Sequence, residues 1–530
     1  MSAAEDRPSI RADRRCGAKV TAKRTRQVAC WSVLLLAAAT SSPQAHAQIA
    51  VRNQGYIPFS DAPINYRSND LNDPVARLQQ QIERGSAHLE FDSDHGYLQS
   101  VLKLLDVPID SQTLVFSKTS FQYPKISPEH PRALYFNDDV YVGSVHEGKA
   151  VEIVSFDPMQ GAIFYLLDEH QVEHPTFQRA ELDCTQCHIA AGTRGIPGVL
   201  LRSVYPTSAG TLVAGAKSYI TDQESPLAER WGGWYVTNAA LGHAGLANAA
   251  APTQPGDSAH GDSGSVSLAP LAPRYDASSY LVGSSDLVAQ LVLAHQTQMH
   301  NLITLTNYRT RLALYAQTAQ TPATAQTVAA VQNSAAAPGA VTAAGLDDAS
   351  ISDGARAQIR RPAEQLVRYL LFVNEASLSG LDGQKVLSDS PFARSFAQRG
   401  PRDSKGRSLR DFDLSTRLFR FPCSYLIYSE AFDKLPEPAK SYVYHRLFEV
   451  LSGREQGAEF PQLSPVDRRA ILEILLETKP ALPVEWHEYA RSNHLRERGA
   501  GAAERAAVVE PGSALAEFNR DLQAVARRNE

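Results

Sequence analysis

The sequence feature that most constrains this chain is Cys184-Thr185-Gln186-Cys187-His188. Two cysteines three positions apart, followed at once by a histidine, have the spacing of covalent c-type haem attachment. One turn of helix places both sulfurs on the same side, where each can form a thioether with a haem vinyl group. His188 then offers its imidazole to the iron as the proximal ligand. The motif therefore predicts one covalent haem c, held by Cys184, Cys187 and His188.

Three alternatives to this interpretation are a chance match, a structural disulfide and half of a zinc site. A zinc site needs about four ligands, usually with a second Cys/His pair, and the sequence has no second Cys-x-x-Cys. Of the five cysteines, Cys16 and Cys30 lie in the N-terminal segment, so only Cys423 remains besides the motif. Cys423 is expected to be a buried small hydrophobic residue.

Residues 1–47 are predicted to be a secretory signal peptide. A basic stretch is followed by an apolar run from Val28 to Thr40, and Ala45-His46-Ala47 gives the small-x-small pattern of a cleavage site. The rival is an uncleaved membrane anchor, but the run is too short for a comfortable span. We therefore expect cleavage after Ala47 and a periplasmic product. Bacteria attach c-type haem outside the cytoplasmic membrane, so the two predictions support each other.

Charge narrows the expected partners. The leader contains eight Lys/Arg against three Asp/Glu, so its removal takes the formal net charge from −5 to about −10. An acidic surface argues against nucleic acid or anionic lipid as a partner. After the leader, no apolar run is long enough to span a membrane. The expected partner is a redox protein.

The expected fold class is mainly α-helical with a small antiparallel β-sheet, and the cytochrome c-type haem site is embedded in a larger, multi-lobed protein. Short β-rich runs separated by turn clusters precede the motif, and a long helix follows it. The predicted segments are 1–47 signal peptide, 48–130 mainly helical, 131–244 β-hairpins and haem attachment, 245–280 loop, 281–315 long helix, 316–355 low-complexity linker, 356–490 C-terminal helices and 491–530 charged tail.

The second axial position of the iron decides whether the haem is closed or open to small molecules. His295 and Met299 lie one turn apart on the apolar face of the long helix, and they are the first two candidates for metal ligation. His243 and His300 are the other histidines considered, and Met159 falls in a predicted β-turn. An iron without a second protein ligand is the remaining alternative.

Other residues are candidates for supporting the haem. A proximal histidine usually donates its second ring N–H to a carbonyl, and a carbonyl between Gly195 and Pro197 is a candidate acceptor, against the alternative of a plain turn. Arg202 and Arg230 are candidates for pairing with haem propionates, against the alternative of ordinary salt bridges.

Four stretches outside the motif carry a resemblance. They are Arg132–Gly143, Ser225–Val236, His295–Asn301 and Pro422–Ser429. Together with the motif they resemble a family of large exported bacterial proteins that carry one c-type haem. The resemblance spans about residues 70–487. It implies a c-type cytochrome and no particular activity.

Two function classes follow from these observations. The first is a periplasmic c-type cytochrome that transfers single electrons, which the single haem motif favours. The second is a haem enzyme, peroxidase-like or handling small oxides, or a haem-based sensor with an open distal iron, which the size of the chain favours. Electron transfer is the preferred interpretation, and no catalytic residue is assigned.

Overall fold

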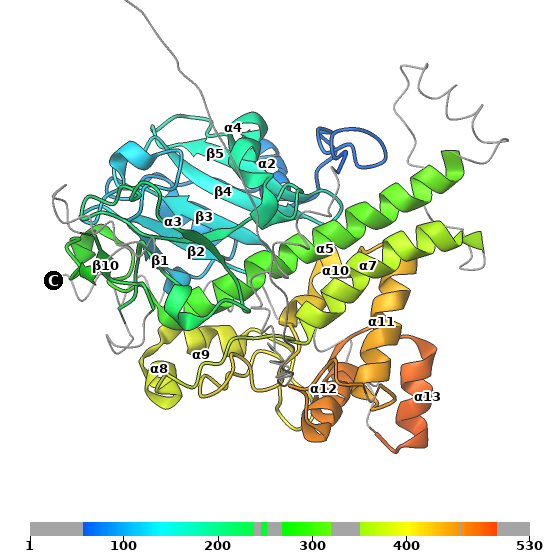
Figure 1. Cartoon of the computed structure of the whole chain (residues 1–530). Helices are drawn as coiled ribbons and strands as arrows, with labels where there is room; N and C mark the ends of the chain where they lie inside the picture. Colours follow the sequence, from blue (N-terminus) through cyan, green and yellow to red (C-terminus); the bar gives the residue numbers. More distant parts are fainter. Residues whose placement is uncertain (1–56, 238–244, 252–267, 320–349, 456, 496–530) are drawn as a thin grey trace, which may run out of the picture. The chain divides into compact units, whose positions relative to one another are not determined.

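An antiparallel sheet of seven strands forms one layer of the protein (Figure 1). The strands are β1 (Thr113–Val115), β2 (Arg132–Phe136), β3 (Val140–Ser144), β4 (Ala150–Asp157), β5 (Gly161–Asp168), β6 (Gln178–Arg179) and β9 (Trp234–Tyr235). Their order is β6-β5-β4-β3-β2-β1-β9, so six follow one another as a meander and the seventh joins from later in the chain. The Asp157 carboxylate closes the β4–β5 turn by accepting from the backbone N–H groups of Met159 and Gln160, both at 2.8 Å.

The computed structural model describes residues 57–237, 245–251, 268–319, 350–455 and 457–495. The predicted signal peptide, His243 and most of the predicted linker and tail lie outside the described residues.

The prediction of a mainly α-helical fold with a small sheet is wrong, because the sheet is a seven-stranded layer of an α+β fold. The β-rich runs are individually short, and they were interpreted as a few hairpins. In the structure they pair continuously, and Leu114 and Val115 also pair with Tyr235 and Trp234 of β9, a segment that had no strand prediction. Residues 48–130 contribute the helices α2 and α3 and the strand β1 of the same sheet.

Alternation along the strands gives the sheet two apolar faces. One face packs against α2 (Pro74–Glu83) and α3 (Leu98–Leu104) in a common hydrophobic core. Asp73 caps α2 by accepting from the N–H of Val75 at 3.0 Å. Its second oxygen accepts from the Tyr165 hydroxyl at 2.8 Å, which ties the helix to β5.

The opposite face packs against the long helix α5 (Leu287–Ala319). Asp286 caps this helix by accepting from the N–H groups of Val288 at 2.7 Å and Ala289 at 3.1 Å. Almost every side chain from Leu287 to Thr310 is buried, the polar ones included. Because this part of α5 has no face exposed to solvent, its polar side chains must form hydrogen bonds with the segments that surround it.

The remaining elements are short strands, the motif helix and the C-terminal helices. The first of these C-terminal helices, α7 (Asp353–Leu370), packs along α5. The strands are β7 (Leu201–Val204) with β8 (Ser218–Thr221), and β10 (Ala249–Ala250) with β11 (Ala269–Pro270). The helices are α4 (Glu181–His188), which carries the motif, then α7 (Asp353–Leu370), α8 (Gly383–Asp389), α9 (Pro391–Gln398), α10 (Glu430–Asp433), α11 (Glu437–Leu451), α12 (Pro465–Thr478) and α13 (Val484–Ser492).

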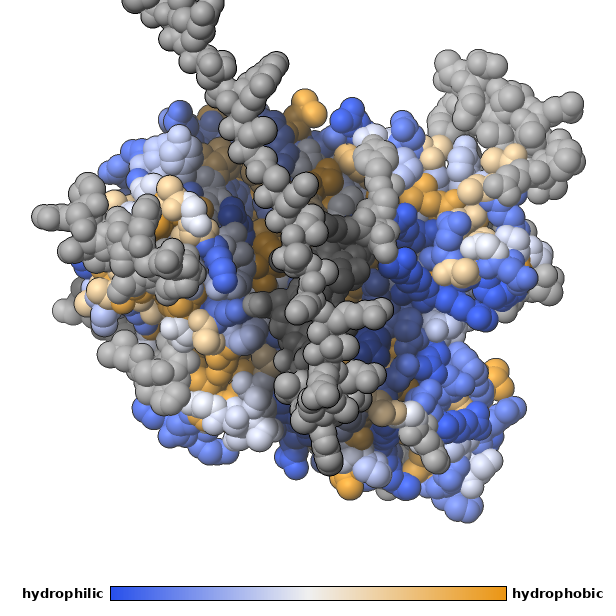
Figure 2. Space-filling model, viewed as in Figure 1, coloured by the Kyte–Doolittle hydropathy of each residue, from blue (hydrophilic) through white to orange (hydrophobic). Residues whose placement is uncertain are grey.

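The face shown in Figure 2 is largely hydrophilic, with scattered hydrophobic residues. The large exposed hydrophobic residues also come from separate elements, such as Leu182 on α4, Val466 on α12 and Val484 on α13. Within the part of the chain that the structure describes, no helix combines the length and apolar character needed to cross a membrane.

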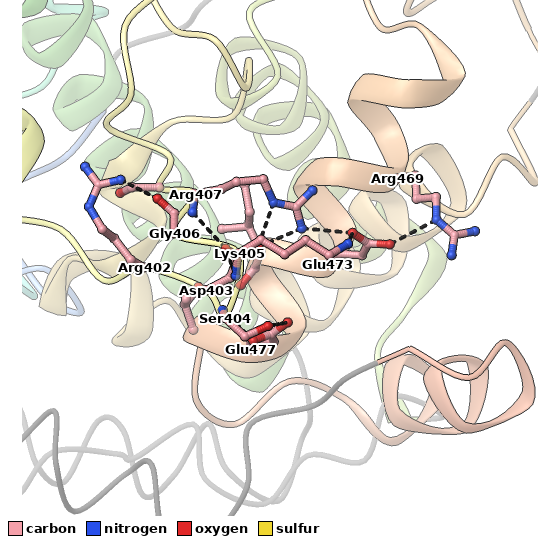
Figure 3. Close-up of polar contacts among 12 residues, drawn as sticks. Arg402, Asp403, Ser404, Lys405, Gly406, Arg407, Arg469, Glu473 and Glu477 are labelled. Atoms are coloured by element: carbon pink, nitrogen blue, oxygen red, sulfur yellow. Dashed lines mark hydrogen bonds and ion pairs between the residues drawn. The ribbon is translucent and has the colours of Figure 1, made fainter.

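A cluster of ion pairs fastens the loop at 402–407 to α12 (Figure 3). Glu473 accepts from Lys405 Nζ at 2.7 Å, Arg407 Nη2 at 2.8 Å and Arg469 Nε at 2.9 Å. Burial alone would raise the pKa of Glu473, but these three hydrogen-bonded cations outweigh it and lower the pKa to about 2. The Glu473 side chain is only 11% exposed, but Lys405 and Arg469 are more than half exposed, so solvent screens part of their attraction.

We expect Glu473→Gln to lower the free energy of unfolding by roughly 2 kcal/mol at pH 7. Because folding depresses the Glu473 pKa, its stabilisation is complete above the ordinary carboxyl pKa of about 4.3 and is lost as pH falls toward 2. Urea unfolding between pH 7 and 3 measures this, with Glu488→Gln, at an exposed position of α13, as the control. Equal losses in the two variants would contradict the prediction.

Candidate haem-attachment site

The motif lies on α4, a short helix that follows directly from the edge strand β6. The N–H of Ala180 donates to Phe164 O at 2.9 Å, and the N–H of Cys184 donates to Ala180 O at 3.2 Å, so α4 starts against β5. No residue of α4 is fully buried. Cys184 is half-buried, Cys187 is exposed, and both are free thiols. The two sulfurs are therefore open to chemistry from the surface.

The imidazole of His188 is held by its backbone surroundings. Nδ1–H donates to the carbonyl of Gly198 at 2.8 Å, and the ring packs on Phe164 with centroids 4.9 Å apart. Burial lowers the pKa of His188, so the ring is neutral near pH 7. With the proton on Nδ1, the lone pair is on Nε2, which has no hydrogen-bond partner among the described residues. The acceptor is Gly198, one residue beyond the interval that the sequence suggested.

The loop that carries Gly198 is fixed by α5. Asn301 accepts from Val199 N–H at 3.0 Å and donates from Nδ2 to Val199 O at 2.7 Å. A Cβ on Gly198 would clash with the Asn301 amide, so glycine is required for this close approach. Asn301 is fully buried and therefore positions the carbonyl that orients His188. No pattern in the sequence indicated this pairing between residues 102 positions apart.

An ion pair lies on the sheet beside the motif. Arg132 of β2 pairs with Glu152 of β4 across Gly143, where any Cβ would clash with the guanidinium. Both charges are close enough to act on Cys184 and His188. Burial, followed by Glu152, raises the pKa of the Cys184 thiol to about 12, so this thiol is protonated. Successive side chains of a strand point to opposite faces of the sheet, so the sequence pattern of β4 could have placed Glu152 on the same face as the motif.

The residues present fit the proximal half of a haem c site. His188 presents an unprotonated Nε2, both thiols are free, and the neighbouring sheet face offers the half-buried side chains of Leu134, Val154 and Leu166. A proximal histidine with its Nδ1–H on a carbonyl is the arrangement that fixes the ring and raises the basicity of the ligating nitrogen.

His295 is placed in a different part of the core. Its Nδ1 is 2.7 Å from Gln223 Oε1, its Nε2 is 2.8 Å from Ser424 Oγ, and Phe372 stacks on its ring at 4.5 Å. Burial lowers its pKa to about 3, so it stays neutral. His295 precedes Asn301 by six residues, which is about 240° around the helix. Both ring nitrogens are therefore engaged, on a side of α5 away from the His188 loop.

The other candidate ligands have partners of their own or lie in the core. Met299 is fully buried in the core along α5. Nδ1 of His300 is 3.0 Å from the Tyr141 hydroxyl, and the ring packs on Phe156 at 3.9 Å. Met159 lies in the β4–β5 turn and is 39% exposed. Among the described residues, none of the three has a hydrogen bond or a ring contact with His188.

The two arginines suggested for propionates differ in exposure. Arg230 is buried and donates to Ser225 O at 2.7 Å and Gln223 O at 3.0 Å. Arg202 is half-buried on β7 and donates to Ser218 Oγ at 3.3 Å. Arg132, which was not a sequence candidate, lies close enough to act on Cys184 and His188.

Comparisons with protein-family models, with curated proteins and with solved structures found no match for this chain. The function is therefore argued from the site alone.

Proposed function

We propose that this protein is an exported c-type cytochrome that holds one haem c through Cys184, Cys187 and His188 and transfers electrons to a redox partner. The observation that carries the proposal is the 2.8 Å hydrogen bond from His188 Nδ1–H to Gly198 O within a Cys-x-x-Cys-His helix. That bond leaves Nε2 as the free ligating atom.

The chain supplies attachment, orientation and electrostatics to such a group. When bound, a haem contributes reversible one-electron chemistry at the iron. Gly198 holds the proton on Nδ1, Phe164 limits rotation of the ring, and Asn301 keeps the Gly198 loop in place. The charges of the Arg132–Glu152 ion pair act on Cys184 and His188.

A second candidate function is a haem enzyme or sensor with an open distal position. The observation that favours it is the hydrogen bonding of both His295 nitrogens, together with the packing of Met299 in the core. Ligation by His295 would require one of two buried hydrogen bonds to break. An iron without a second protein ligand binds small molecules.

The wild-type protein tests both proposals when produced with haem-attachment machinery. We expect haem to stay with the chain through acid–acetone extraction and denaturing electrophoresis, and haem that extracts freely would contradict attachment. A low-spin ferric spectrum with ferrous protein that resists carbon monoxide is expected for the electron carrier. A high-spin spectrum with rapid carbon monoxide binding would replace it by the open-iron function.

A further inference from the structure

One face of the main sheet is only half covered beside the motif. Along β2, β4 and β5 buried residues are interrupted by half-buried ones, and the half-buried side chains of all three strands point to the same face. They are Arg132, Leu134, Glu152, Val154 and Leu166. Further along the strands, the same face is buried against α5. The sheet therefore presents a half-exposed surface, mostly apolar, at the end that α5 leaves uncovered.

The strand register places three of these side chains and Gly143 in one row. Leu134 of β2 lies directly opposite Gly143 of β3. Gly143 lies opposite Glu152 of β4, which in turn lies opposite Leu166 of β5. Adjacent strands are about 4.8 Å apart, so the row spans roughly 14 Å. Val154, two residues along β4 from Glu152, widens the same surface. A surface of this width can take a porphyrin ring.

The centre of this row is formed by a glycine and an ion pair. Nε, Cζ and Nη2 of Arg132 lie so close over Gly143 that any Cβ would clash with them, so the guanidinium lies across the sheet. Arg132 pairs there with Glu152, and the two formal charges cancel. Glu152 also accepts from Ser120 Oγ at 2.7 Å and from Gln122 Nε2 at 2.9 Å. The centre of the row therefore carries no net formal charge.

The motif helix meets this surface from the β5 side. The His188 ring packs on Phe164, and Phe164 lies directly opposite Val154 in the sheet. Cys184 packs against the same hydrophobic cluster as Leu134 and Val154. The ion pair of the row is also close enough to act on Cys184. A group attached through the two motif sulfurs therefore starts beside the half-exposed surface.

We propose that Leu134, Val154 and Leu166, around the Arg132–Glu152 pair, form the haem-binding surface of this protein. The inference rests on the proposed function, because the occupant is the haem attached through the motif. A porphyrin is a large, planar and mainly apolar group, so contact with apolar side chains removes the surface of both from water. One wall of the haem site is then a β-sheet, and it comes from strands that precede the motif in sequence.

Carbene photolabelling followed by peptide mass spectrometry tests the proposal without any substitution in the haem-binding surface. The haem-loaded wild type is compared with the haem-free chain in which both motif cysteines are alanine, and circular dichroism checks that both are folded. Labelling of Leu134, Val154 and Leu166 should fall several-fold in the haem-loaded protein. Val466 and Val484 are internal controls, 78% and 68% exposed on α12 and α13, and should be labelled equally in both chains.

Charged substitutions in the surface give a second measurement. A carboxylate beside the haem favours the ferric iron, so Val154→Asp should lower the reduction potential of the haem-loaded protein, whereas Val154→Lys should raise it. The same two substitutions at Val466 should leave the potential unchanged. Lost packing alone would move both Val154 variants in the same direction, so opposite shifts identify a charge placed next to the haem.

The outcomes separate this inference from the proposed function. Wild-type protein that carries covalent haem, yet is labelled at Leu134, Val154 and Leu166 as strongly as the haem-free chain, would overturn the haem-binding surface alone. Shifts of the same sign in the two Val154 variants, or equal shifts at Val466, would also overturn it. Wild-type protein without covalent haem would overturn the proposed function and this inference together.

Discussion

Replacing Cys184 and Cys187 together by alanine is expected to abolish covalently held haem and to leave the chain folded. Each thioether requires its own sulfur, so the double variant has no attachment point. The fold should survive because no residue of α4 is fully buried. Haem staining after denaturing electrophoresis measures attachment. Thermal unfolding followed by circular dichroism measures stability, which should change by less than about 1 kcal/mol relative to haem-free wild type.

Cys423→Ala is the matched control for this experiment. Cys423 is fully buried and belongs to the core, so its truncation leaves a small void. We expect it to keep its haem and to lose about 1 kcal/mol of stability. Haem stain that persists in the double variant, or disappears with Cys423→Ala, would rule out the assigned attachment residues.

Asn301→Ala is expected to destabilise the protein by about 3 kcal/mol and to disturb the haem environment. The change leaves both the N–H and the carbonyl of Val199 without their partner inside the core. It also frees the neighbouring Gly198 carbonyl that orients His188. Urea unfolding measures the first effect. The second should appear as a shifted absorption band and an altered reduction potential of the haem-loaded protein.

Asn307→Ala controls for the loss of a buried asparagine on the same helix. Within the described part of the chain, its amide donates to Met159 Sδ at 3.9 Å and accepts from Arg311 Nη1 at 3.3 Å. We expect a loss of about 1 kcal/mol and an unchanged haem spectrum. Indistinguishable spectra in the two asparagine variants would mean that Asn301 does not position the His188 loop.

Local sequence signals predicted the parts of the site that are close together in the chain. The motif predicts a short helix, and α4 contains all five of its residues. A carbonyl between Gly195 and Pro197 was one candidate acceptor beside the alternative of a plain turn, and the structure has the bond at Gly198, ten residues from its donor. Contacts between residues this close in the chain can be predicted from their spacing in the sequence.

Long-range pairings were not predictable in the same way. No strand was predicted at Trp234-Tyr235, yet it pairs with Leu114 and Val115 in the main sheet. The apolar-face argument for His295 also weakens for a physical reason. Helix α5 is buried on all sides from Leu287 to Tyr308, so a period of 3.6 residues does not single out the face that meets a cofactor.

The buried polar side chains of α5 also bear on when the protein can fold. Gln296 donates to Asn137 O at 2.7 Å and accepts from the Tyr425 hydroxyl, so one side chain joins segments 288 residues apart. The hydrogen bond between His295 and Ser424 likewise cannot form until residue 424 has been synthesised. A chain that emerges from its N-terminus leaves these groups unpaired until residue 425 has appeared. The core around α5 therefore closes late, and the many contacts of high sequence separation predict slow folding.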